Sequence, residues 1–283
     1  MRIGYHTITW GGVVGDPTGV TSVKDLFYRA SGSMEQAIAD IGSLGYQGVE
    51  MFDGNVADFA GRPDELRTLL EQAGVELVSV YTGGNFIFDD VLPDELHRVT
   101  RAAELAQSFG AHSLIVGGGA RRASGTTGAD YTKLASALDR VTNIAAAHDL
   151  VACYHPHLST IVESPEELDR ILHQTRIGFC PDTAHIAAGG GDPAEIIRRY
   201  ADRLRHVHLK DVRLDPFAFL PLGQGEIDFT DVLRAVHESG YDGWLLVELD
   251  SYDGDPRDAA AASKTYLDNL LATAGSSNIG GPS

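Results

Sequence analysis

Eight short apolar segments alternate with eight longer amphipathic segments along the 283 residues of this chain, and this alternation restricts the fold more than any other feature. The short segments are rich in β-branched residues, which predicts strands at residues 2–10, 48–52, 75–81, 113–116, 151–155, 177–182, 204–210 and 244–248. The longer segments carry helix start and stop signals, which predicts helices at residues 33–45, 63–74, 93–110, 131–148, 164 onward, 193–200, 229–238 and 256–274. Strict alternation of this kind predicts a parallel sheet.

Eight strand–helix units are also the number that closes a parallel sheet into a barrel, and the chain length fits one such barrel. An open, doubly wound sheet is the alternative, but it normally has fewer strands and a G-x-G-x-x-G motif after the first strand. Residues 11–15 read Gly-Gly-Val-Val-Gly, which lacks that spacing. We therefore predict an α/β fold, a single-domain (β/α)8 TIM barrel over residues 1–275, followed by a disordered tail at residues 276–283.

The charge of the chain bears on its partners. Asp and Glu number 40 against 22 Lys and Arg, and the net charge of −18 repels nucleic-acid phosphates and anionic membrane surfaces. No apolar run approaches the ~20 residues of a membrane span, and the start lacks the apolar stretch of a secretory signal. Cys153 and Cys180 lie in apolar, strand-like runs and form no disulfide framework. We expect a cytoplasmic protein that binds neither nucleic acid nor membranes.

Polar residues gather where the predicted strands end, which is where barrels of this type place their chemistry. Asp182 and Glu248 each end an apolar run, where a buried carboxylate requires a cation or hydrogen bonds. Histidines stand at other strand ends, and His208 shares one face of its strand with Lys210. A satisfied core or surface histidine is the ordinary alternative at each single position. Four different strands, however, each end in a histidine or a carboxylate. The sequence therefore predicts a mixed nitrogen and oxygen site for a divalent metal.

Four segments of the second half carry most of the histidines and carboxylates at the strand ends: residues 154–163 (YHPHLSTIVE), 181–185 (PDTAH), 205–213 (RHVHLKDVR) and 223–228 (GQGEID). Together they resemble the xylose-isomerase-like TIM barrels, the superfamily of sugar phosphate isomerases and epimerases, and most of all its inosose dehydratase branch. The resemblance runs from residue 3 to about residue 271 and is densest over the last four strands.

This resemblance implies a metal centre with Asp182, His208 and Glu248 as ligands. The fourth ligand of the family is usually a Glu at the end of the fifth strand, but here that position holds His155, with His157 two residues later. The fourth ligand is therefore His155 or His157, and we expect His155. The ion is expected to be Mn²⁺, with Co²⁺, Mg²⁺, Fe²⁺ and Zn²⁺ as alternatives. Epimerases of the superfamily use that Glu as one of two proton-transfer bases. Because this chain has a histidine there, the resemblance favours a dehydratase or lyase over a two-base epimerase.

The resemblance also implies roles for residues around the metal. His185 matches an active-site histidine of the family, and Glu163 matches an acidic position that binds substrate or transfers protons. The expected catalytic residues are Glu163, His157, His185 and Lys210. The expected substrate contacts are His6, Trp10, Glu50 and Arg213.

The function that follows is an enzyme acting on a small carbohydrate. It would remove the proton next to the carbonyl of a keto-polyol or keto-sugar through a metal-stabilised enediolate, leading to dehydration, isomerisation or epimerisation. The alternative enzyme is a lyase that cleaves 3-keto-glycosides, including C-glycosides, by β-elimination. A metal-dependent endonuclease is disfavoured by the charge of −18, and a protein that only binds sugar ranks last. The sequence leaves open whether the protein forms a homo-oligomer or is a subunit of a hetero-oligomer.

Overall fold

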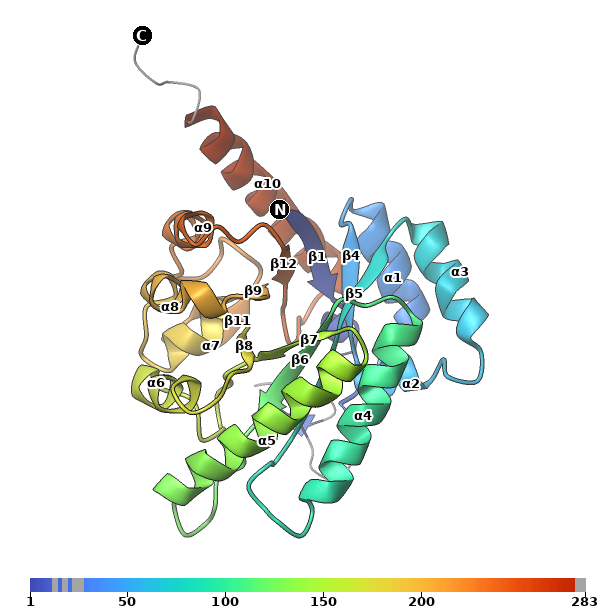
Figure 1. Ribbon diagram of the computed structural model, residues 1–283. Helices are drawn as coiled ribbons and strands as arrows, with labels where there is room; N and C mark the ends of the chain where they lie inside the picture. Colours follow the sequence, from blue (N-terminus) through green and yellow to red (C-terminus); the bar gives the residue numbers. More distant parts are fainter. Residues whose placement is uncertain (12–14, 17–19, 22–27, 278–283) are drawn as a thin grey trace.

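The computed structural model describes residues 1–11, 15–16, 20–21 and 28–277 (Figure 1). Its central sheet has eight strands in the order β8-β7-β6-β5-β4-β1-β12-β9, and the paired neighbours run parallel. The strands are β1 (Arg2–His6), β4 (Gly48–Phe52), β5 (Glu76–Gly84), β6 (Ser113–Gly118), β7 (Val151–Tyr154), β8 (Gly178–Phe179), β9 (Val207–Leu209) and β12 (Trp244–Val247).

The two edges of this sheet meet, so the sheet closes. Isolated parallel bridges join Phe179 to Leu204 and Asp182 to His208. The backbone N–H of His208 donates to the carbonyl oxygen of Pro181 at 2.9 Å. The predicted (β/α)8 barrel is thereby confirmed, and its closure sets Asp182 directly beside His208.

The helices surround the sheet on the outside (Figure 1). Neighbouring helices pack against each other around the ring, for example α4 against α5, and α10 against α1. The helices are α1 (Met34–Ser43), α2 (Asp53–Ala57), α3 (Pro63–Ala73), α4 (Leu92–Ser108), α5 (Gly128–Ala147), α6 (Pro165–Leu172), α7 (Thr183–Ala188), α8 (Pro193–Arg199), α9 (Phe229–Glu238) and α10 (Pro256–Ser277). Helix α10 includes residues 276–277 of the expected tail, and residues 278–283 lie outside the described residues.

Two predicted strands end three or more residues earlier than expected. The first stops at His6, because the Ile8 N–H donates to His6 Nδ1 at 2.9 Å and residues Thr7–Thr9 form a 3-10 turn. The sixth is reduced to Gly178–Phe179, since Pro181 has no N–H to donate and Asp182 caps α7 instead. The sequence also missed the short helices α2 and α7 and the hairpin of β10 (Asp211–Arg213) and β11 (Ala218–Leu220).

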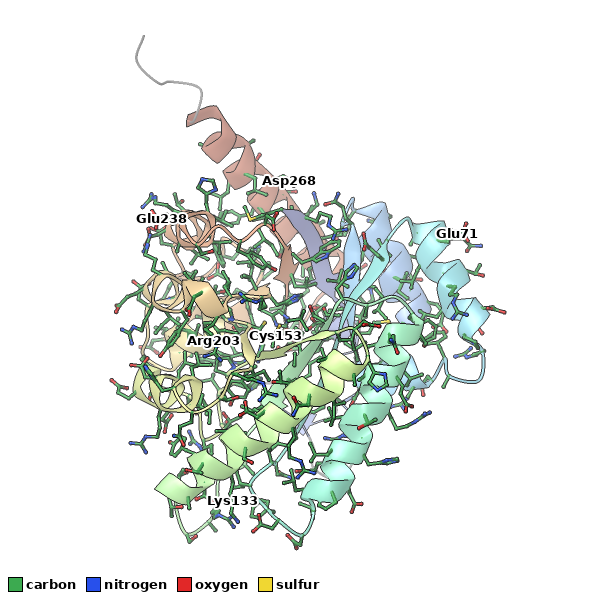
Figure 2. All side chains as sticks on the ribbon, viewed as in Figure 1. Glu71, Lys133, Cys153, Arg203, Glu238 and Asp268 are labelled. Atoms are coloured by element: carbon green, nitrogen blue, oxygen red, sulfur yellow. The ribbon has the colours of Figure 1, made fainter. Side chains whose placement is uncertain are left out.

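Apolar side chains fill the space between sheet and helices. Figure 2 places Cys153 in the middle of the molecule and Glu71, Lys133 and Glu238 at its periphery. Cys153 and Cys180 are buried free thiols, as expected for a chain without a disulfide framework. Among the described helices, none combines the length and the apolar character that crossing a membrane requires.

The start of α6 offers a stability prediction. The Ser164 hydroxyl accepts the Glu167 N–H at 3.3 Å, and the Glu167 carboxylate accepts the Ser164 N–H at 2.9 Å. Because Ser164→Ala removes one half of this capping box, we expect the free energy of unfolding to fall by about 1 kcal/mol in urea titrations. Ser108→Ala is the control, because this exposed hydroxyl near the end of α4 caps no helix start, and it should cost less than about 0.5 kcal/mol. Equal effects would show that the capping box does not stabilise the fold.

Candidate metal centre and active site

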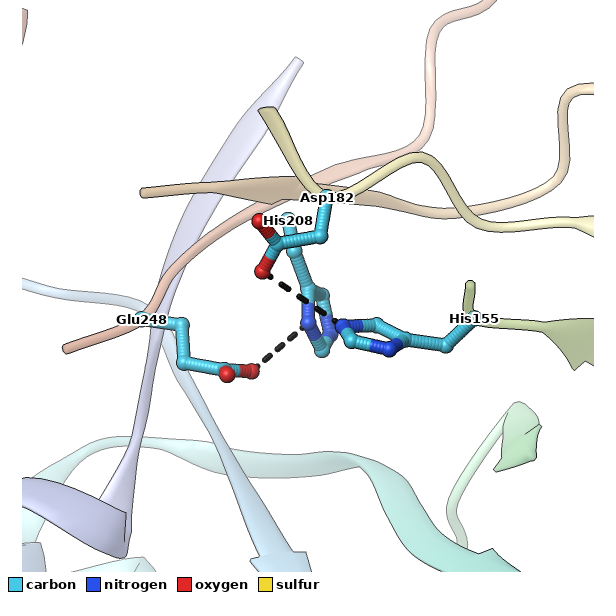
Figure 3. A group of neighbouring side chains, drawn as sticks. All are labelled: His155, Asp182, His208 and Glu248. Atoms are coloured by element: carbon cyan, nitrogen blue, oxygen red, sulfur yellow. Dashed lines mark ion pairs between the residues drawn. The ribbon is translucent and has the colours of Figure 1, made fainter. Parts of the chain in front are cut away.

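Four side chains meet at the carboxyl ends of four strands (Figure 3). They offer one donor atom each, and these atoms all lie within 4.8 Å of one another. All four side chains are buried, and they come from directly after β7, after β8, on β9 and directly after β12. The four are His155, Asp182, His208 and Glu248.

The donor atoms of this cluster face one another without forming aligned hydrogen bonds. His155 Nε2 lies 3.4 Å from Asp182 Oδ2, and His208 Nδ1 lies 2.7 Å from Glu248 Oε2. None of these four buried atoms has a hydrogen-bond partner within the described structure. Burying polar atoms that lack aligned hydrogen bonds is costly, so the arrangement fits a cation among them. Two imidazoles and two carboxylates suit a divalent transition metal.

The two carboxylates of the cluster are held in their ionised form. Burial by itself raises the pKa of Asp182, but Lys210 and His155 outweigh it and bring that pKa below its ordinary value. Burial likewise raises the pKa of Glu248, and Lys210 and His208 reverse the effect and hold it well below the usual range. Both side chains can therefore serve as anionic ligands at neutral pH.

Lys210 is a buried cation beside the cluster. Its Nζ lies 3.0 Å from Glu248 Oε1, forms a short contact with Asp250 Oδ1 and stands 4.4 Å from the ring centre of Phe219. Burial lowers the pKa of Lys210, but Asp250 and Glu248 outweigh this and raise it, so the ammonium keeps its proton. Burial, followed by the Glu248 charge, raises the pKa of Asp250 to about 7 even though Lys210 opposes the shift.

Asp250 is a site residue that the sequence analysis did not select. It follows Glu248 by two residues, so the two-residue period of an extended chain was the available signal. Phe219 lies on the hairpin strand β11, which the sequence analysis also missed. No pattern in the chain indicated that this hairpin would reach Lys210.

Three predicted catalytic residues line one pocket beside the cluster: His157, Glu163 and His185, together with Ile186. The rings of His157 and His185 lie 3.7 Å apart between centroids. Burial lowers the pKa of His157 to about 4 and that of His185 well below its ordinary value, so both rings are neutral near pH 7. Glu163 is half-buried and accepts hydrogen bonds from Arg121 at 2.7 Å and the Ser159 N–H at 2.8 Å.

The four expected substrate contacts lie in different surroundings. Trp10 donates its Nε1–H to Asp40 at 3.0 Å, and the Arg213 Nε–H donates to the Pro216 carbonyl at 3.0 Å, so both are engaged in contacts outside the cluster. The other two, His6 and Glu50, are buried, and each has a donor atom within 4.8 Å of one on Glu248.

The Glu50 carboxylate lies among side chains rather than in the pocket. It contacts His208, His206, His6 and Ser79. Burial raises the pKa of Glu50, but His208, His206 and His6 outweigh it and hold that pKa well below the usual range.

Comparison with known proteins gives the same fold family. The sequence profile of the family described as "Xylose isomerase-like TIM barrel" matches residues 38–270. An inosose dehydratase of Geobacillus kaustophilus is 32% identical, and the match covers 96% of this chain and 95% of that protein. An inosose dehydratase of Lacticaseibacillus casei is 29% identical over 84% of this chain and 90% of its own length.

Solved structures show a related fold at lower identity. A crystal structure of the IOLI protein with a bound zinc atom superimposes with a TM-score of 0.75 at 15% identity, covering 96% of this chain and 99% of that one. At this identity the likeness extends to the fold alone.

Proposed function

Since this chain belongs to the xylose isomerase-like TIM barrel family, we propose that it is a divalent-metal-dependent dehydratase that acts on a keto-polyol of the inosose type. The observation that carries the proposal is the buried cluster of two imidazoles and two carboxylates, whose four facing atoms form no aligned hydrogen bond among the described residues, beside a pocket with two neutral histidines. The named dehydratase relatives, which match over most of their length, support the same reaction.

In this proposal His155, Asp182, His208 and Glu248 hold the ion, with Mn²⁺ expected first. The zinc atom of the IOLI protein, which has the same fold, supports a divalent cation in general. When bound, such an ion polarises a carbonyl and stabilises the negative charge that develops as the neighbouring C–H loses its proton.

The tautomers of the two pocket histidines suggest separate roles. His157 Nδ1 lies 2.7 Å from the Leu158 carbonyl oxygen, so Nδ1 carries the hydrogen and Nε2 is left with a lone pair. His157 can therefore accept the proton of the substrate. Lys210 Nζ lies 3.2 Å from His185 Nε2 and donates to it, which puts the His185 hydrogen on Nδ1. That Nδ1–H has no partner among the described residues. It can pass its proton to a departing hydroxyl group, which leaves as water, while the Lys210 ammonium gives a proton to His185 Nε2 and keeps the ring neutral.

The test is turnover of inosose (2-keto-myo-inositol) in D₂O by the Mn²⁺-loaded protein, followed by proton NMR. We expect loss of water from inosose and entry of solvent deuterium next to the carbonyl, with no cleavage of a 3-keto-glucoside. Cleavage of the 3-keto-glucoside without inosose turnover would favour the β-elimination lyase instead. Isomerisation of a ketose alone would favour an isomerase. Each of these two results would overturn the proposed reaction.

A variant separates the proton acceptor from the metal ligands. Because His157→Gln removes the free imidazole lone pair but none of the four cluster residues, we expect it to bind the metal normally. Its exchange and dehydration rates should fall by about 10²-fold. Wild-type exchange rates in this variant would contradict the role of His157.

A further inference from the structure

We propose that Glu50 is a positioning residue, whose carboxylate fixes His208 in the tautomer that turns a lone pair toward the metal. This inference rests on the proposed metal centre and adds a residue to it. Glu50 does not touch the substrate in this account. It acts through His208, and it replaces the substrate contact that the sequence analysis expected at this position.

Four side chains contact the Glu50 carboxylate, and one of them is the cluster residue His208. Glu50 Oε1 lies 3.1 Å from His208 Nε2 and 3.4 Å from His6 Nε2, and Oε2 lies 3.4 Å from His206 Nε2. The Ser79 hydroxyl donates to the same carboxylate. The strand register explains this meeting, since Glu50 pairs with His6 on one side and with Ser79 on the other. One buried carboxylate thus faces three imidazole nitrogens.

The hydrogen on His6 can be placed from geometry. The backbone N–H of Ile8 donates to His6 Nδ1 at 2.9 Å, so Nδ1 carries the lone pair. The hydrogen of the neutral ring is then on Nε2, which faces Glu50. His6 is therefore a donor to this carboxylate.

His208 is held between two carboxylates, one at each ring nitrogen. Its Nδ1 faces the cluster at 2.7 Å from Glu248 Oε2, whereas its Nε2 faces Glu50 at 3.1 Å. A metal bond at Nδ1 requires a lone pair there, which places the hydrogen on Nε2. A carboxylate that accepts the second N–H of a ligating histidine fixes both the tautomer and the ring orientation.

A second cation beside Glu50 is the competing explanation, because Glu50, His206 and His208 also bring donor atoms within 4.8 Å of one another. Such an ion would need the lone pair of His208 at Nε2, which would leave an N–H pointing at the first cluster. It would also meet the Nε2–H of His6. We therefore infer a hydrogen-bonded carboxylate and one metal ion.

The test compares Glu50→Gln with Glu95→Gln. Glu95 is another buried glutamate, and it accepts the N–H groups of Asn85 and Phe86 rather than contacting the cluster. Chelator competition with Mn²⁺ should give a 10- to 100-fold weaker affinity for Glu50→Gln, the usual cost of losing such a partner. Glu95→Gln should bind as the wild type does. If Glu50→Gln does not fold, Glu50→Asp is the second variant. It keeps the negative charge, but its shorter side chain places the carboxylate farther from His208, so a weaker Mn²⁺ affinity is expected there too.

A second readout does not depend on activity. Nitrogen-15 NMR of the protein loaded with diamagnetic Zn²⁺ should show the His208 hydrogen on Nε2 with the shift of a hydrogen bond to a carboxylate in the wild type, and that shift should be lost in Glu50→Gln. Unchanged affinity together with an unchanged Nε2–H signal would overturn the role of Glu50 alone. Two Mn²⁺ per wild-type chain would favour the second cation and overturn it as well. No Mn²⁺ binding by the wild type would instead refute the metal centre itself.

Discussion

His208→Ala is expected to lose the bound metal and the enzymatic activity together. The imidazole stands between Glu248 and Glu50, and its removal leaves Glu248 Oε2 without its neighbour at 2.7 Å. The Lewis acidity of a bound ion supplies several kcal/mol of transition-state stabilisation, so turnover of inosose should fall by roughly 10³-fold or more. Metal content by mass spectrometry and deuterium exchange by NMR measure the two losses on the same sample.

The matched control is His112→Ala. His112 is an exposed histidine that lies 3.2 Å from Glu76. It directly precedes β6 and Glu76 begins β5, so it lies at the amino ends of the strands, whereas the cluster lies at their carboxyl ends. It should keep both metal and activity. A full equivalent of metal in His208→Ala would contradict the assignment of His208 as a ligand.

Lys210→Met is expected to destabilise the metal-free protein more than any surface change. The buried ammonium lies close to Glu248 and Asp250 and 4.0 Å from Asp182, and methionine would leave these carboxylates uncompensated. Removing one partner of a buried ion pair lowers the free energy of unfolding by about 3–5 kcal/mol. Urea titrations in the presence of EDTA should show this loss at pH 8. Lys133→Met, which removes an exposed pair with Asp89, should cost at most about 1 kcal/mol.

The loss in Lys210→Met should depend on pH in a defined direction. Asp250 already has a pKa of about 7 in the folded protein, above its ordinary value, and removing Lys210 raises it further. Asp250 in the folded variant then keeps its proton at a pH where the same residue has lost it in the unfolded chain, so the stability difference between Lys210→Met and the wild type should shrink as the pH falls from 8 to 5.5. Asp250→Asn in the same chain should recover part of the loss. A cost that is independent of pH and unaffected by Asp250→Asn would show that the carboxylates are not its cause.

The barrel could be predicted from the sequence because it depends on a periodic signal. Eight alternating segments required a parallel sheet, and the strands at residues 48–52 and the helix at residues 229–238 have the expected bounds. The short helix α7 could not be predicted in this way. It begins because Asp182 accepts the His185 N–H at 2.8 Å, a local bond that competes with a longer strand.

The candidate site was predictable to the extent that the fold dictates it. Barrel closure sets the carboxyl ends of the strands on one rim, which is why Asp182, His208 and Glu248 could be expected to meet. The structure places His155 with them and His157 in the adjoining pocket, and His155 as the fourth ligand stays a prediction. Whether a side chain at a strand end reaches the pocket or is enclosed by its neighbours has no signature in the sequence. The expected substrate contact of Glu50 therefore stays a prediction, which the proposed positioning role would replace.

The most direct test of the metal centre is a crystal structure of the Mn²⁺-loaded protein, with diffraction data collected at the metal absorption edge. The account predicts one anomalous peak bonded at about 2.0–2.3 Å to His155 Nε2, Asp182 Oδ2, His208 Nδ1 and Glu248 Oε2. A peak between Glu50 and His206, or no peak at the four-residue cluster in crystals whose protein binds Mn²⁺ in solution, would contradict it.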